Sequence, residues 1–258
     1  QESRGLGDVY KRQLYHSPLA TPDNLDQGSL QDMGGQVLDL THALLQADQL
    51  PQQAADVVFF DVFGMMTVIY PVWLGWIMLI LAGGGLLLVM RQDGADGLAT
   101  GAGRMLALIV LSAATVFLLN RLSLGLQPPN YYDRLAAIPR LEIMAALGAL
   151  ATFLAVIGTW QPARVGVAGA ALPLFAIGLV AQAFAPTAAY ILTLPLMLTA
   201  LALLIPHPAV RIGVAALVCG YMLSLGHQLM QGVGPTLPFA NALPLALAVL
   251  TLLPLWPS

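Results

Sequence analysis

Charged side chains are scarce in this sequence. Only 9% of its 258 residues are Asp, Glu, Lys or Arg, whereas 58% are hydrophobic. Soluble domains carry about 25% charged residues, so this composition excludes an ordinary water-soluble globular protein. The net charge is −3, and the few arginines stand singly between apolar runs. A nucleic-acid-binding protein needs clustered basic residues, so that class is excluded as well.

Cysteine is nearly absent. Cys219 is the only one in the sequence, so the chain cannot form an internal disulfide framework or a thiolate metal site. It lies within an apolar run, where a cysteine usually serves as a small buried apolar side chain.

The first residues differ in character from the rest. Residues 3–13, SRGLGDVYKRQ, resemble the translation of a transposon adapter used in shotgun sequencing. Such a segment must be kept out of fold reasoning. We therefore expect residues 1–13 to be an artefact, the natural sequence to begin at Leu14, and the coding sequence to extend further upstream. Lys11, the only lysine, belongs to this segment.

Residues 14–61 have the composition of a soluble domain. Residues 15–26 are rich in Pro, Asp, Asn and Ser, which favours a loop. An amphipathic helix should follow, capped by Asp26 or Ser29 and ending near Leu50, because Pro51 disfavours helical geometry in the residue before it. Residues 57–60 fit either a last strand or a contact with the membrane surface. The helix is predicted from apolar residues at a spacing of three or four, namely Leu30, Met33, Val37, Leu40 and Leu44.

Long uncharged apolar runs fill the rest of the chain. Residues 67–90 contain no charge and are long enough to cross a hydrocarbon core of about 30 Å. Aromatic residues near their start, among them Trp73 and Trp76, are typical of the headgroup layer. We predict seven spans, which make residues 62–258 an all-α transmembrane helical bundle. The other six are residues 105–119, 141–160, 165–185, 188–205, 212–230 and 237–255.

The loops give an orientation through their arginines. Connections on one side of the membrane hold four arginines, and connections on the other side hold three. The positive-inside tendency places the larger set in the cytoplasm, so residues 14–61 are expected outside. The larger set is Arg91, Arg104, Arg164 and Arg211, and the smaller set is Arg121, Arg134 and Arg140.

A short motif before the predicted helix carries the chemical information. The sequence YHSPLATPD places His16 between Tyr15 and Ser17, and Thr21 and Asp23 follow. Neutral imidazole is a good zinc ligand. The stretch resembles the C-terminal signature of the co-catalytic di-zinc exopeptidases, metallopeptidase family twenty-eight, typified by aminopeptidase Y. In that family a His-[Ser/Thr]-x-x-Asp-Thr loop supplies the last metal ligand.

The resemblance implies a role for each part of this segment. His16 would be a zinc ligand, and residues 14–61 would be the end of an α/β peptidase domain whose other ligands and general base are absent from this chain. Two zinc ions sharing a hydroxide would activate water and polarise the scissile carbonyl of a peptide. The parent is thus expected to be a zinc-dependent aminopeptidase, and this fragment alone is expected to be inactive.

Two details qualify the motif. Ala20 occupies the position where the family pattern usually carries an aspartate. Loss of an acid that supports a metal ligand typically lowers metal affinity or activity about 10–100-fold, so full activity of the parent is in question. His42 lies on the polar side of the predicted helix and is expected to be solvated.

The following sequence fits membrane-anchored members of the same family. Residues 58–64, VFFDVFG, and the pair Tyr70-Pro71 resemble vacuolar membrane proteases and endoplasmic-reticulum metallopeptidases, in which a lumenal peptidase precedes many spans. The protein is therefore expected to be an integral multi-pass membrane protein. Its peptidase side should face the periplasm or the outside of the cell. The alternative is a polytopic transporter or scaffold without peptidase activity.

Polar residues within the spans are few. No charged residue falls in the interior of a predicted span, which argues against an ion pathway. His227 has no acidic partner in its own span. The polar loop 127–142 fits either an interfacial loop or a docking site for the catalytic domain. Hydrogen bonds between helices are the expected role of the polar residues Gln182, Tyr221, His227, Gln228 and Asn241.

Overall fold

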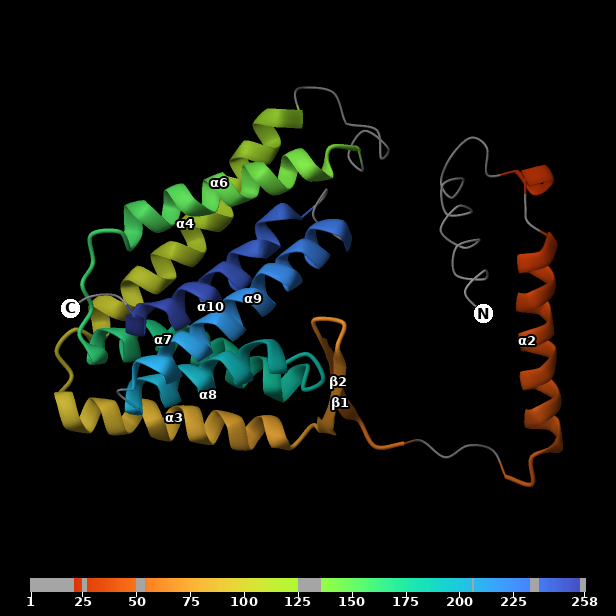
Figure 1. Cartoon of the computed structure of the whole chain (residues 1–258), viewed down its shortest axis with the longest axis horizontal. Helices are drawn as coiled ribbons and strands as arrows, with labels where there is room; N and C mark the ends of the chain where they lie inside the picture. The colour runs from red at the N-terminus through yellow and green to blue at the C-terminus, as the bar shows by residue number, and fades with distance from the viewer. Residues whose placement is uncertain are drawn as a thin grey trace. The chain divides into compact units, whose positions relative to one another are not determined.

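The computed structural model describes residues 21–24, 27–49, 54–124, 136–205, 207–232 and 237–255. Contacts divide the chain into two units, Gln1–Ala54 and Ala55–Ser258. Figure 1 shows the second unit as a bundle of helices that begins with a β-hairpin. The domain boundary expected near Asp61 falls inside this hairpin.

The first unit contains the amphipathic helix expected from the apolar spacing. After the short 3-10 helix η2 (Pro22–Asn24), helix α2 runs over Gln27–Gln46. It ends before Leu50, where the sequence placed its end. Ser29 lies inside α2 and is therefore not its N-terminal cap, while Asp26 lies outside the described residues.

Helix α2 exposes its apolar stripe. No residue of α2 is buried, and the stripe residues are 38–65% exposed. Contiguous exposed apolar surface usually marks an interaction site. Among the described residues of the first unit, nothing covers this stripe.

The second unit opens with an antiparallel hairpin of β1 (Val57–Val62) and β2 (Met66–Pro71). This settles the open question over residues 57–60 in favour of a strand. At the turn, Phe63 and Gly64 both have positive φ, and Asp61 Oδ2 accepts a hydrogen bond of 2.5 Å from Gly64 N. The predicted span 67–90 is wrong at its start, because its β-branched and aromatic first residues favour a strand.

Seven helical segments follow the hairpin in the described residues. Six of them are long and apolar enough to cross a membrane, and α8 is shorter, at 15 residues. A helix of that length spans only about 22 Å. The prediction of seven spans thus becomes six long helices and one short one. The segments are α3 (Leu74–Asp93), α4 (Leu98–Leu124), α6 (Ile138–Val156), α7 (Arg164–Phe184), α8 (Tyr190–Leu204), α9 (Pro208–Gly232), and η3 (Pro238–Asn241) continuing into α10 (Ala242–Leu252) and η4 (Leu253–Leu255).

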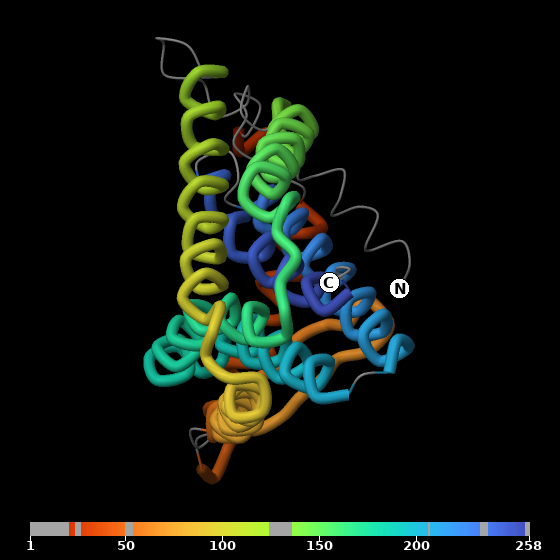
Figure 2. The backbone as a smooth tube through the Cα atoms, turned by 90° about the vertical axis from the view of Figure 1, so that its left-hand side faces the viewer, coloured from red at the N-terminus to blue at the C-terminus, as the bar shows by residue number. Residues whose placement is uncertain are grey.

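The helices form a bundle with an apolar interior and an apolar exterior. Helix α4 packs most extensively on α7, and α3 packs most extensively on α8. In Figures 1 and 2, α4 and α6 lie side by side. Outward residues such as Ile80, Ile143 and Leu223 are 62–75% exposed, as suits contact with lipid. Apart from the hairpin, the described part of the second unit is an all-α helical bundle of the multi-pass membrane type. Its centre is filled by fully buried side chains that include Leu79, Leu86, Met105, Leu108, Leu174, Leu196, Leu247 and Leu250.

Arginines gather at one end of the bundle. Arg164, at the start of α7, pairs with Asp93 at the end of α3, with Nη1 and Oδ1 3.4 Å apart. Arg104 Nη1 donates to Val156 O at 2.5 Å, and Arg211 Nε donates to Ala202 O at 3.2 Å. These bonds bring the end of α3 to the start of α7, the start of α4 to the end of α6, and the start of α9 to the end of α8. We call this the arginine end.

Helices α4 and α7 approach closely through glycines. A Cβ added at Gly101 would lie 2.0 Å from Gly166 O, and one added at Gly169 would lie 2.3 Å from Leu98 O. Small residues allow this approach, which is a main source of helix association in membranes. Gly103, on another face of α4, has nothing within 4 Å of its added Cβ.

We predict that Gly101→Ala destabilises the bundle by about 1–3 kcal/mol, because the methyl group forces α4 and α7 apart. Gly103→Ala is the matched control. It should be neutral or stabilising by up to about 1 kcal/mol, since alanine favours helix and the site is open. Unfolding of the purified chain in detergent, by heat or by sodium dodecyl sulfate, measures both. Equal stability of the two variants would contradict the glycine contact.

Candidate functional site

The residues of the expected zinc-ligand loop lie mostly outside the described part of the chain. Tyr15, His16 and Ser17 are among these. Thr21 and Asp23 are described, and both are exposed at η2, just before α2. Within the described residues, no group of three or more His, Cys, Asp or Glu side chains is arranged to hold a metal ion.

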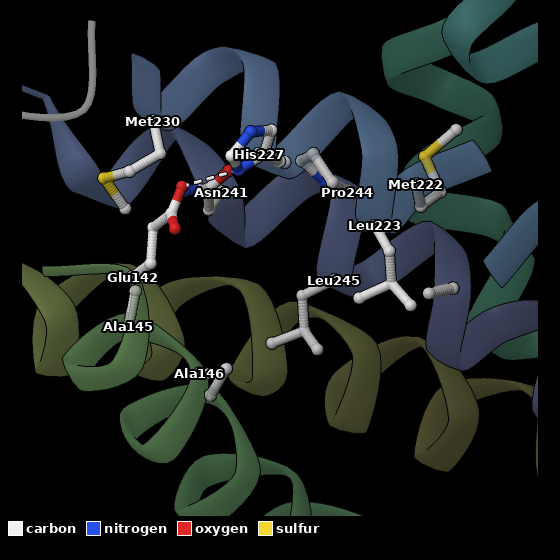
Figure 3. A pocket seen from close by; sticks show the side chains of 13 residues that line it. Glu142, Ala145, Ala146, Met222, Leu223, His227, Met230, Asn241, Pro244 and Leu245 are labelled. Carbon is white, nitrogen blue, oxygen red and sulfur yellow. Dashed lines mark hydrogen bonds and ion pairs between the residues drawn. The ribbon is translucent and has the colours of Figure 1, made fainter. Parts of the chain in front are cut away.

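The described residues do form a polar-rimmed cavity between α6, α9 and α10. Its volume is about 290 Å³. Figure 3 shows Glu142 reaching from α6 toward His227 of α9, with Asn241 beside the bonded pair. The rest of the wall is mostly apolar and includes Ala145 and Leu245. We call this space the α6–α9 cavity.

The rim of the α6–α9 cavity is held by a hydrogen-bonded pair. His227 Nδ1 lies 2.7 Å from Glu142 Oε1. Gln231 Nε2 donates to the same oxygen at 3.4 Å. The side chains of Glu142 and His227 are 31% and 61% exposed, so a pair of this kind contributes at most about 1 kcal/mol to stability.

Two acceptors at the cavity are left open. Glu142 Oε2 has no hydrogen-bond partner among the described residues, since the bonds from His227 and Gln231 both end on Oε1. Asn241 Oδ1 is buried and also has no partner there. A buried acceptor without a partner costs about 1–3 kcal/mol. This part of the site is therefore suited to a ligand that donates hydrogen bonds.

Sequence reasoning missed the partner of His227. The acid comes from α6, and Glu142 lies where the predicted loop 127–142 and the predicted span 141–160 overlap. The available signal was Pro139, because proline is favoured in the first turn of a helix. Helix α6 indeed begins at Ile138 with proline in its first turn, so Glu142 falls inside it.

The hairpin brings aromatic residues against α8 and α9. Phe60 stacks on Tyr190, with ring centroids 4.4 Å apart and an interplanar angle of 7°. Tyr221 Oη donates to Tyr190 Oη at 3.5 Å. A second cavity of about 280 Å³, almost wholly apolar, lies beside these rings. The hairpin is thereby fixed to the bundle.

Other polar residues of the spans also bond between segments. Gln182 Nε2 donates to Val72 O at 2.9 Å, which ties the end of α7 to the residue after β2. Val72 lies outside the helices, so the hydrogen bonds expected between helices are confirmed for two of the five residues, Tyr221 and His227. Cys219 is half-buried in α9, and its Sγ donates to Ala248 O at 3.6 Å.

The fold and these sites define a polytopic helical membrane domain with a β-hairpin packed on it. Comparisons of the chain with known protein families, with curated proteins and with solved structures find no match.

Tyr70 gives a test of how the hairpin packs. Its side chain is buried, and this burial, together with the nearby Tyr190, raises the pKa of Tyr70 from 10.0 to about 12. The folded state therefore holds the phenolic proton more tightly than the unfolded state. The stability linked to this difference is complete below pH 10 and is lost as the pH rises toward 12.

We predict that Tyr70→Phe loses less stability than the wild type between pH 10 and pH 12, because phenylalanine has no proton to lose. Unfolding of both proteins in detergent across this range measures the difference. The absorbance of tyrosinate, followed in parallel, should lack one late-titrating group in the variant. Identical stability profiles would contradict the buried position of Tyr70.

Proposed function

We propose that this chain is part of a membrane-bound zinc aminopeptidase that hydrolyses N-terminal peptide bonds. The observation that carries the proposal is the motif from Tyr15 to Asp23, which ends within η2 and is followed by the amphipathic helix α2. In this proposal His16 is one zinc ligand. Tyr15, Ser17, Thr21 and Asp23 form the loop that holds it.

The exposed apolar stripe of α2 supports the proposal that this helix packs on another part of the parent protein. Its five apolar residues are all at least 38% exposed. An isolated helix of this length is marginal in water, because most helical stability in proteins comes from packing of an apolar face. In the proposal, α2 is the closing helix of the peptidase domain and packs on residues that precede this sequence in the parent protein.

The zinc pair itself requires residues from outside this chain. One imidazole cannot retain two zinc ions, and the described residues supply no further cluster of ligands. The chain alone is therefore proposed to be inactive. Ala20, which replaces the usual aspartate of the pattern, leaves His16 with weaker support.

The orientation belongs to the proposal as well. The arginine end holds Arg91, Arg104, Arg164 and Arg211, and the positive-inside tendency assigns it to the cytoplasm. The hairpin contacts the starts of α3 and α8, which are opposite their ends at the arginine end. Residues 14–61 would then lie on the extracytoplasmic side, in the periplasm or outside the cell.

The alternative is a polytopic transporter or scaffold without peptidase activity. The observation in its favour is the pair of Glu142 and His227, since ionisable residues in membrane domains often mark transport pathways. The pair lies within two turns of the ends of α6 and α9, however, and not near the middle of the spans. We therefore prefer the peptidase.

We predict that His16→Ala abolishes chelator-sensitive release of N-terminal amino acids by the full-length gene product in membranes. His42→Ala is the matched control and should keep the activity, because His42 is an exposed residue of α2. Residues 14–258 expressed alone should be inactive. Equal activity of the two variants would remove His16 from the zinc site, and no activity in any folded full-length protein would favour the alternative.

We predict the sidedness of the chain from single cysteines in a Cys219→Ala background. A cysteine at Ala55, just before the hairpin, should react with an impermeant maleimide on intact cells. A cysteine at Ala95, at the arginine end, should react only after lysis. The reversed pattern would contradict the orientation and leave the fold unaffected.

A further inference from the structure

We propose that the α6–α9 cavity binds an aminophospholipid of the bilayer, with the primary ammonium of its headgroup on Glu142 and an acyl chain along the apolar wall. The proposal concerns the membrane domain itself. It does not rest on peptidase activity.

The charge and the open acceptors select the headgroup. Glu142 Oε2 and Asn241 Oδ1 both lack partners among the described residues. Glu142 carries negative charge, so it favours a cation and disfavours an anionic headgroup. A primary ammonium has three N–H donors and can donate to the open carboxylate oxygen of Glu142. A trimethylated ammonium has no donor and leaves that oxygen without a hydrogen bond.

The wall of the cavity suits a hydrocarbon chain. Between the polar rim and the middle of the bundle it is lined by small and apolar side chains, including Ala149, Met222, Leu245 and Ala248. Figure 3 shows Leu223, Leu245 and Ala146 around the space that continues from the rim. Helices α6 and α9 make few contacts with one another, in contrast to α6 with α4.

The mouth of the cavity lies on the outer apolar surface of the bundle. Leu223, which lines it, is 75% exposed, and Ile143 and Leu147, which follow the lining residues Glu142 and Ala146 in α6, are each 62% exposed. These side chains lie on spans long enough to cross a membrane. A lipid could therefore enter sideways from the bilayer.

The depth of the rim matches that of a headgroup. Glu142 lies in the second turn of α6, and His227 lies within two turns of the end of α9, both opposite the arginine end. Two turns correspond to about 11 Å. The ammonium would therefore sit near the membrane surface, and the acyl chain would extend toward the middle of the bundle.

The experiment measures lipid retention by the full chain in nanodiscs of equimolar dioleoyl phosphatidylethanolamine and phosphatidylcholine, with a phosphatidylglycerol arm. Lipids that stay bound after extraction into mild detergent are identified by native mass spectrometry. We expect about three- to tenfold enrichment of phosphatidylethanolamine over phosphatidylcholine, in keeping with the strength of a charge-assisted hydrogen bond at a partly exposed site.

Two variants test the site in different ways. Glu142→Gln should remove the enrichment by removing the charge. Ala146→Phe should remove it by blocking the mouth, and because Ala146 is exposed the larger side chain should leave folding intact. Asp96→Asn, an exposed acid at the arginine end, is the matched control and should behave as the wild type.

Three results would overturn the proposal. Equal retention of phosphatidylethanolamine and phosphatidylcholine by the wild type would mean an apolar groove without headgroup recognition. Enrichment of phosphatidylglycerol would mean a site of the opposite charge. Enrichment unchanged in both Glu142→Gln and Ala146→Phe would place the bound lipid elsewhere on the chain.

Discussion

The close approach of α4 and α7 is the contact on which the rest of the bundle depends. In hydrocarbon, an apolar side chain gains little by leaving lipid for protein, so helices associate through close packing of their backbones. Gly101, Gly166 and Gly169 supply that packing. Helix α7 also packs against α3 and α8, while α4 also packs against α6 and α10. The α4–α7 contact thus joins two groups of helices that have fewer contacts elsewhere.

Hydrogen bonds of polar side chains join the ends of the packed helices. Arg104, Arg164 and Arg211 bond across helix ends at the arginine end, where water and lipid headgroups can solvate them in part. At the other end, Gln182 and the aromatic contacts of Phe60 hold the hairpin. Each of these bonds joins residues from different segments, so together they set how the helices end against each other.

The helices after residue 90 were easier to predict from the sequence than the segment before the first helix. Long uncharged runs determine where backbone must be helical in a membrane, because hydrocarbon offers no other hydrogen-bond partners. For that reason five of the six spans predicted after residue 90 lie within four residues of the observed helices, whereas the span 105–119 covers only the middle of α4. The start of the first span was misjudged, since residues 67–71 are apolar enough for a span but are β-branched and aromatic, and they pair with β1.

The candidate sites were harder to predict because they depend on partners far apart in the chain. Glu142 and His227 are separated by 85 positions, and no local pattern shows that α6 and α9 meet there. The orphaned oxygen of Asn241 is likewise visible only in three dimensions. His16 is the opposite case: its proposed role comes entirely from a local motif, and its position lies outside the described residues.

The hairpin follows α2 in sequence and packs on the bundle. In the proposal, the bundle anchors the peptidase to the membrane, where peptides that reach the extracytoplasmic surface can be cleaved.

Metal content of the full-length gene product tests the central claim most directly. The zinc content of protein purified from membranes without added chelator would be measured by inductively coupled plasma mass spectrometry, with His16 intact and with His16→Ala. The account predicts a pair of zinc ions per chain in the first protein and a clear loss of zinc in the second. Folded full-length protein that holds no zinc, or that holds the same amount in both forms, would contradict it.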